Sequence, residues 1–84
     1  MRNGWTEIDN TLCKTFEFQS FEAAMQWMQM ASEKISVLNH HPEWTNCYNR
    51  VEVKLCTHDA GNRVTEKDML LAEVLDACFA EMKP

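Results

Sequence analysis

Four features are missing from this sequence, and their absence excludes several classes of protein. There is no run of about 18 apolar residues, so we expect no segment to cross a membrane. There is no surplus of basic residues, because the formal net charge is −5, and proteins that bind nucleic acid or anionic membranes favour basic patches. There is no C-x-x-C pair, and the first residues carry no apolar signal peptide. We therefore expect a cytoplasmic protein with reduced, non-catalytic thiols.

The composition is that of a globular protein. Of the 84 residues, 45% are hydrophobic and 10% aromatic, which argues against disorder. A chain of this size buries only about 60–65% of the surface that its unfolded form exposes. We expect residues 1–84 to form one domain, which is compact or gains further burial by oligomerising.

Alternating residues predict a hairpin near the N-terminus. Its strands are expected at residues 5–9 and 11–18, joined by Asp9-Asn10, two residue types that tolerate positive φ. In the second strand, the apolar residues of one face are Leu12, Phe16 and Phe18. Lys14 interrupts this face.

A second hairpin is predicted at residues 44–48 and 51–57, with Asn49-Arg50 as its turn. Val51, Val53 and Leu55 alternate with polar residues, which predicts a strand with one buried face. The strand ends at Thr57-His58, so a rigid sheet would hold His58 at its C-terminal end.

A helix is predicted from Phe21 to Leu38, with Ser20 as its N-cap. Its apolar stripe consists of Phe21, Ala24, Met25, Met28, Ala31, Ile35 and Leu38. Trp27 lies off this stripe, and we expect it at the margin of the core or against a partner.

A second helix is predicted after Thr65, which would form a capping box with Asp68. Its main apolar residues are Leu71, Val74, Leu75, Cys78, Phe79 and Met82. This face is broader than one small sheet would cover, which predicts a contact between subunits.

The order of these elements is strand, strand, helix, strand, strand, helix. Hairpins separated by helices predict an α+β fold of two layers, in which a four-stranded antiparallel sheet carries both helices on one face. The opposite face of the sheet is then available to a ligand or a partner.

The three histidines are confined to one part of the chain, at His40, His41 and His58. Imidazole gains or loses a proton near neutral pH, and Pro42 favours an extended backbone at His41. Three interpretations are open. The histidines could bind a metal, they could be structural and satisfied by hydrogen bonds, or they could serve general acid–base catalysis on a flat heterocycle with Trp44 as an apolar wall.

Four motifs of the chain resemble those of the pterin-4a-carbinolamine dehydratases. They are Asn39-His40-His41-Pro42-Glu43-Trp44, Tyr48-Asn49-Arg50-Val51, Leu55-Cys56-Thr57-His58-Asp59-Ala60-Gly61 and Thr65-Glu66-Lys67-Asp68. They occur in the order that is typical of the family, and the similarity extends upstream to Gly4-Trp5. It therefore covers almost the whole chain.

The resemblance implies a lyase that converts 4a-hydroxytetrahydropterin to quinonoid dihydropterin and water, and so recycles the cofactor of aromatic amino acid hydroxylases. It implies no metal and no organic cofactor. His40 and His58 would be the acid–base pair, although which is the acid is open, and His41 would help to hold the pterin. Asn39, Trp44 and Asp68 would line or support the site, while Asp68 also has a structural explanation as a capping residue.

The resemblance also implies a homodimer or homotetramer, and it brings an alternative function from another class. Animal relatives act as a dimerisation cofactor of a homeodomain transcription factor, so the chain could be a non-catalytic interaction module.

Three departures from the family pattern concern the surroundings of the histidines. Ser36 stands where Glu is common, Asn39 replaces a common Asp, and the loop at Asn62-Arg63-Val64 is one residue longer.

Overall fold

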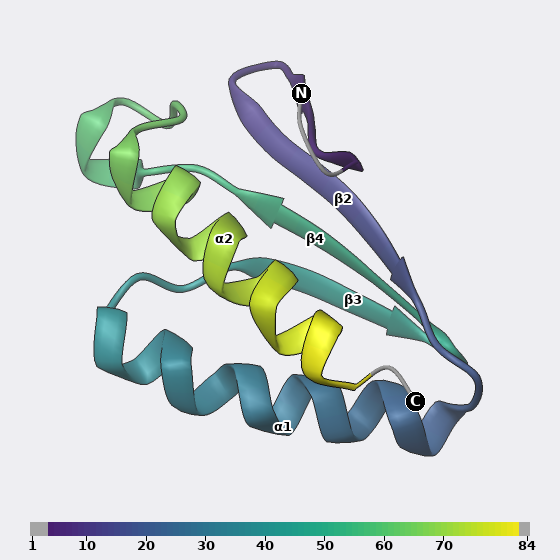
Figure 1. Cartoon of the computed structure of the whole chain (residues 1–84). Coiled ribbons are helices and arrows are strands. Elements are labelled where there is room, and N and C mark those ends of the chain that lie inside the picture. Colours follow the sequence, from purple (N-terminus) through teal and green to yellow (C-terminus); the bar gives the residue numbers. More distant parts are fainter. Residues whose placement is uncertain (1–3, 83–84) are drawn as a thin grey trace.

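The computed structural model describes residues 4–82. A four-stranded antiparallel sheet has the strand order β1-β2-β4-β3, and two helices lie on one of its faces (Figure 1). The elements in chain order are β1 (Thr6–Ile8), β2 (Thr11–Glu17), α1 (Phe21–Leu38), β3 (Glu43–Cys47), β4 (Arg50–Leu55), the short 3-10 helix η2 (His58–Ala60) and α2 (Glu66–Glu81). The predicted α+β fold and its element order are confirmed. No helix within the described residues is both long enough and apolar enough to cross a membrane.

Two tight turns fix the registers of the hairpins. Asp9 and Asn10 both adopt positive φ, at 51° and 62°, as their sequence predicts. The second turn lies one residue earlier than expected, because Arg50 pairs with Cys47 and so belongs to β4. The turn residues are Tyr48, with φ of 54°, and Asn49.

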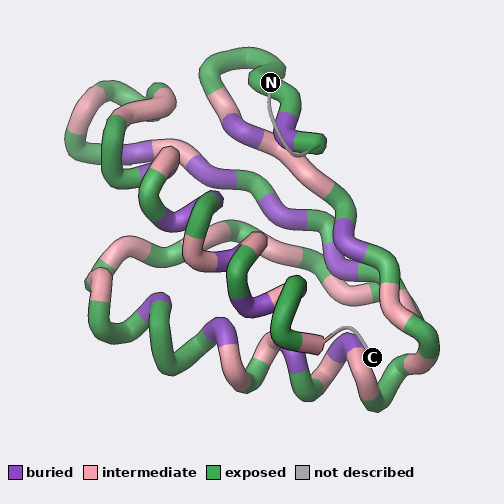
Figure 2. The backbone as a smooth tube through the Cα atoms, in the orientation of Figure 1, coloured by how far each residue is buried: buried purple, intermediate pink, exposed green. Residues whose placement is uncertain are grey.

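The core lies between the sheet and the two helices, where the buried positions of Figure 2 face one another. The inward side of β4 contributes Val51, Val53 and Leu55, each no more than 1% exposed. Directly paired β2 residues, among them Leu12 and Phe16, are buried beside them. These central strands supply the apolar floor on which both helices pack.

Trp27 is part of this core, and its expected place at the margin is wrong. Its side chain is fully buried, and its Nε1–H donates to the carbonyl oxygen of Leu75 in α2 over 3.3 Å. Its ring lies 4.6 Å from that of Phe16 and 5.8 Å from that of Trp44, between centroids. The predicted apolar stripe omits Trp27 because α1 packs against α2 as well as against the sheet, so its buried surface is wider than one stripe. Phe21, which begins the predicted stripe, is instead 42% exposed.

Lys14 interrupts an apolar strand face because it has a partner on α2. Its Nζ lies 2.7 Å from Asp76 Oδ1, and the Nε1–H of Trp5 donates to Asp76 Oδ2 over 3.0 Å. The ammonium also lies 4.6 Å from the centroid of the Phe16 ring, a favourable distance for a cation above an aromatic face. Asp76 therefore links Trp5 and Lys14, at the start of the sheet, to helix α2.

The last turns of α2 place Cys78 in the core, where the residue is 2% exposed. Burial raises the pKa of its thiol, and nearby Glu81 raises it further. The thiol therefore stays protonated and packs as a small apolar group.

Replacement of Trp27 by alanine should lower the free energy of unfolding by about 3–5 kcal/mol, because it removes a buried indole and leaves a cavity. Gln26→Ala is the matched control in the same helix: Gln26 is exposed, and the change should stay within about 0.5 kcal/mol. Urea unfolding of both variants measures the difference. Similar small losses in the two would contradict the burial of Trp27.

Candidate functional site

A hollow of about 360 Å³ lies where the segment after α1 meets the segment after β4. It is lined by Asn39, His40, His41, Pro42, Glu43, Cys56, Thr57, His58, Asp59 and Lys67. The structure thus brings together four residues that the sequence predicts for the site: Asn39, His40, His41 and His58. We call this hollow the histidine cleft.

The end of α1 delivers two of the histidines to the cleft. Asn39 caps the helix in the left-handed conformation, with φ of 55°, and its N–H donates to the carbonyl oxygens of Ile35 and Ser36. Left-handed asparagine is a common way to stop a helix. The chain then runs through His40 and His41 into β3, which begins at Glu43.

Asp68 lies behind the cleft, fully buried, and holds His40 in place. Its Oδ1 lies 2.6 Å from His40 Nε2. Its Oδ2 accepts hydrogen bonds from the Thr57 hydroxyl at 2.8 Å and from the Thr65 backbone N–H at 2.9 Å. The predicted capping box is confirmed, and the same carboxylate also contacts a predicted site residue.

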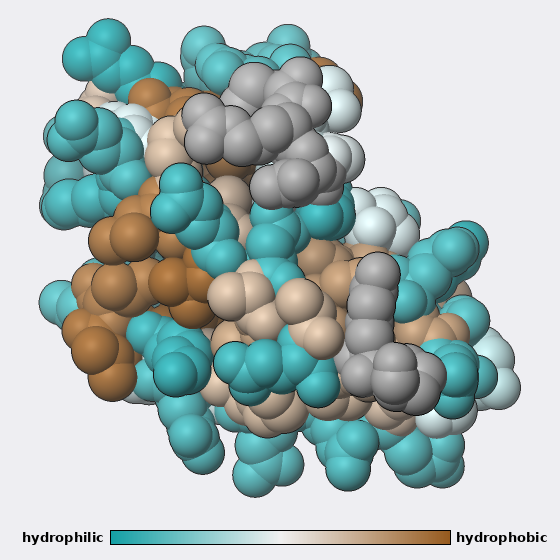
Figure 3. All heavy atoms as spheres, in the orientation of Figure 1, coloured by the Kyte–Doolittle hydropathy of each residue, from teal (hydrophilic) through white to brown (hydrophobic). Residues whose placement is uncertain are grey.

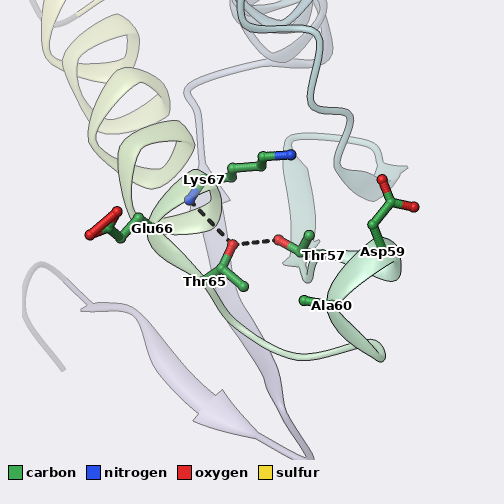
Figure 4. Close-up of a pocket in the computed structure, with 6 residues that line it drawn as sticks. All are labelled: Thr57, Asp59, Ala60, Thr65, Glu66 and Lys67. Carbon is green, nitrogen blue, oxygen red and sulfur yellow. Dashed lines mark hydrogen bonds between the residues drawn. The ribbon is translucent and has the colours of Figure 1, made fainter.

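The hydroxyl groups of Thr57 and Thr65, which Figure 4 shows joined by a hydrogen bond, have only one consistent set of directions. The Thr57 hydroxyl has a single hydrogen, which it donates to Asp68. The Thr65 hydroxyl, 2.7 Å away, must therefore donate to Thr57 Oγ1, while it accepts from Lys67 N–H over 3.3 Å. The hydrogen-bonded chain from the first turn of α2 thus ends on Asp68 Oδ2. An ionised carboxylate carries no hydrogen, so Oδ1 is an acceptor as well. His40 Nε2 consequently donates to this carboxylate.

His58 starts the 3-10 helix η2 and lies at the exposed rim of the cleft. Its Nδ1 lies 2.6 Å from Asn62 Oδ1. In the sequence, Asn62 follows a glycine and indicates only a turn. Its contact with His58 depends on how the loop closes, which the sequence does not show. Gly61 and Asn62 form this turn, with φ of 83° and 58°.

Two predicted residues stand apart from the cleft lining. Asp68 contributes through His40, as described above. Trp44 packs against the core beside Trp27, so a contact between Trp44 and a ligand stays a prediction.

Lys67 lines the cleft, although the sequence predicted no role for it beyond its place in the motif Thr65-Glu66-Lys67-Asp68. It also borders a second hollow, of about 370 Å³, together with Thr57, Asp59, Ala60, Thr65 and Glu66 (Figure 4). A third and smaller hollow joins Lys67 to His40 and Leu70. The positively charged Lys67 therefore shares the lining of the histidine cleft with the acidic residues Glu43 and Asp59.

Metal binding was one interpretation of the histidines. Between residues 4 and 82, no group of three or more His, Cys, Asp or Glu side chains is arranged to hold an ion. The hydrogen bonds of His40 to Asp68 and of His58 to Asn62 instead leave the other ring nitrogen of each histidine for a ligand.

These features define a small two-layer α+β protein with a histidine-lined cleft over a buried carboxylate. Residues 1–78 match the family model described as pterin 4 alpha carbinolamine dehydratase. The chain belongs to this family, and the resemblance seen in its motifs is confirmed.

Relatives and solved structures agree with this membership. A protein of Opitutus terrae, provisionally named a pterin-4-alpha-carbinolamine dehydratase, is 52% identical over 69 residues, which cover 82% of this chain and 71% of the relative. One of Solibacter usitatus with the same provisional name is 43% identical over 94% of this chain and 82% of its own.

Among solved structures, a transcriptional coactivator/pterin dehydratase from Brucella melitensis superposes with a TM-score of 0.85 at 40% identity, over 90% of this chain and 82% of that one. A pterin dehydratase-like RuBisCO assembly factor of the alpha-carboxysome shares the fold, with a TM-score of 0.79 at 18% identity over 93% and 92% of the two chains.

Replacement of Asp68 by asparagine should lower the free energy of unfolding by about 2–4 kcal/mol, because a buried acceptor becomes partly a donor and loses its charge-assisted bonds. Glu66→Gln is the matched control: it also removes a carboxylate from the first turn of α2, but Glu66 is exposed, and its loss should be within about 0.5 kcal/mol. Urea unfolding measures both. Equal losses would show that Asp68 acts only as a first-turn charge.

Proposed function

We propose that this protein dehydrates 4a-hydroxytetrahydropterin to quinonoid dihydropterin and water, by general acid–base catalysis between His40 and His58. The observation that carries the proposal is the convergence of His40, His41 and His58 on one cleft from two separate segments. Membership of the family supports it. The reaction would recycle the cofactor of aromatic amino acid hydroxylases.

The reaction needs one proton given and one proton taken. A protonated imidazole gives a proton to the hydroxyl on C4a, the C–O bond breaks, and water leaves with the bonding pair. The lone pair of N5 forms the double bond to C4a, and a neutral imidazole takes the N5 proton. Exchange with water then restores both histidines. Each positioned proton transfer contributes about 10²–10⁴-fold.

The surroundings of the two histidines favour His40 as the acid. Its Nε2 donates to the buried carboxylate of Asp68, an arrangement that orients the imidazole and turns Nδ1 toward a ligand as the second donor. Nδ1 of His40 is then the atom that gives a proton to the substrate. His58 contacts a neutral amide instead, which suits the base.

The remaining predicted residues would bind the pterin rather than exchange protons. His41 and Asn39 line the cleft and can offer hydrogen bonds to the polar edge of the pterin ring. Trp44 would act as the apolar wall if ligand binding exposes its ring. No metal or organic cofactor is required by these steps.

Replacement of either His40 or His58 by alanine should lower kcat for pterin carbinolamine dehydration by about 10²–10⁴-fold, because each change removes one proton transfer. The measurement is ultraviolet absorbance during dehydration of a freshly generated carbinolamine, corrected for the rate in buffer. Lys54→Ala is the control, since Lys54 is an exposed residue of strand β4 that lies outside the cleft, and the change should leave kcat unchanged.

Circular dichroism must show that the three variants fold. Wild-type protein no faster than buffer would overturn the enzymatic proposal and leave the non-catalytic interaction module. Full activity in folded His40→Ala and His58→Ala variants would overturn the assigned residues.

We also propose that the chain associates into a homodimer or homotetramer through its exposed apolar surface. Figure 3 shows apolar side chains gathered at the left of the view, where the end of α1 and the first turns of α2 lie. The exposed apolar residues include Val37 at the end of α1 and Leu70 in α2, at 84% and 50% exposure. Such a surface would also suit a role like that of the Brucella melitensis protein, whose name describes it as a transcriptional coactivator as well as a pterin dehydratase.

Sedimentation equilibrium should therefore find an oligomer at micromolar concentration, and Leu70→Lys should weaken it, because a charge in an apolar contact is costly to desolvate. Lys54→Ala serves again as the control. A strict monomer for the wild-type protein would contradict the contact.

A further inference from the structure

The loop from Thr57 to Val64 folds back on itself more tightly than a simple connection requires. The Thr57 N–H donates to Arg63 O over 2.8 Å, and the Asn62 N–H donates back to Thr57 O over 3.1 Å. Gly61 and Asn62, both at positive φ, make the reversal possible. This closure brings the Asn62 side chain next to the ring of His58, four residues earlier.

The contact between these side chains determines where His58 carries its hydrogen. Asn62 Oδ1 lies 2.6 Å from His58 Nδ1. An amide oxygen only accepts hydrogen bonds, so Nδ1 is the protonated nitrogen of the neutral ring. The unprotonated nitrogen is then Nε2, which keeps a lone pair.

We propose that Asn62 is a positioning residue that holds His58 in the Nδ1–H tautomer and so presents Nε2 as the proton acceptor for N5 of the substrate. The inference rests on the proposed dehydration, and it adds a residue from the loop that departs from the family pattern. It also explains how the two histidines differ: Asp68 engages Nε2 of His40, whereas Asn62 engages Nδ1 of His58. Opposite ring nitrogens are therefore left for the two proton transfers.

The loop permits a clean test, because Asn62 has φ of 58°. Asn62→Gly removes the amide and tolerates this backbone conformation, whereas alanine would add strain. Asn62→Asp keeps an oxygen acceptor at the same place. Asn10→Gly is the matched control: Asn10 is also left-handed, with φ of 62°, but lies in the turn between β1 and β2.

The first readout is the ring ¹⁵N chemical shifts of neutral His58 in the full chain without substrate. The wild-type, Asn62→Asp and Asn10→Gly proteins should show the Nδ1–H tautomer. Asn62→Gly should shift His58 toward the Nε2–H form that free histidine prefers in water. An unchanged tautomer in Asn62→Gly would overturn the proposal.

The second readout is kinetic. Water competes for this exposed contact, so Asn62→Gly should lower kcat by about three- to tenfold, the effect of one modest hydrogen bond, with KM unchanged. Asn62→Asp should recover most of the loss. A change in KM alone, or no change in kcat, would overturn the positioning role. Inactivity of the wild-type protein would overturn the proposed function instead, and the tautomer measurement would still test the hold of Asn62 on His58.

Discussion

The buried carboxylate of Asp68 is the group on which the site depends. A carboxylate removed from water is costly unless its oxygens are hydrogen-bonded, and Asp68 is fully buried. It has partners from three parts of the chain: the α2 cap through Thr65, the segment after β4 through Thr57, and the segment after α1 through His40. The hydrogen bonds that satisfy this one charge therefore join the start of α2 to the segments that follow α1 and β4, at the point where the cleft forms.

This arrangement bears on the departures at Ser36 and Asn39. Loss of an acidic residue one turn before His40 would matter most if that residue alone oriented the imidazole. Here His40 is oriented by Asp68 instead, from the neighbouring helix. Asn39 still ends α1 in a left-handed conformation, which an asparagine adopts readily. The change at Asn39 thus leaves intact the backbone geometry that delivers the histidines.

The fold was predictable because local signals agreed with one another. Alternation in the strands, the caps at Ser20 and Thr65 and the turn at Asp9-Asn10 are all short-range features, and each is present. Trp27 was misplaced because its burial depends on α2, about 48 residues later in the chain, which helical periodicity alone does not describe.

The sequence predicted the histidines of the candidate site, but it did not predict the side chains that hold them in place. The motifs pointed to His40, His41 and His58, and the cleft contains all three. The dual role of Asp68 and the contact of Asn62 with His58 depend on side-chain distances across a closed loop. In the sequence, a capping box fully explains Asp68 and a glycine–asparagine turn fully explains Asn62. Neither residue therefore shows a pattern that would indicate its second role.

The most direct test of the account is a titration of the protein with 7,8-dihydrobiopterin, a stable pterin that cannot react, followed by NMR. The account predicts that the ring signals of His40, His41 and His58 move together with one affinity, while the backbone signals of Ile8 and Val37, which lie outside the cleft, stay in place. Histidine signals that do not move, or shifts centred on Val37 instead, would contradict the central claim that the three histidines form one pterin site.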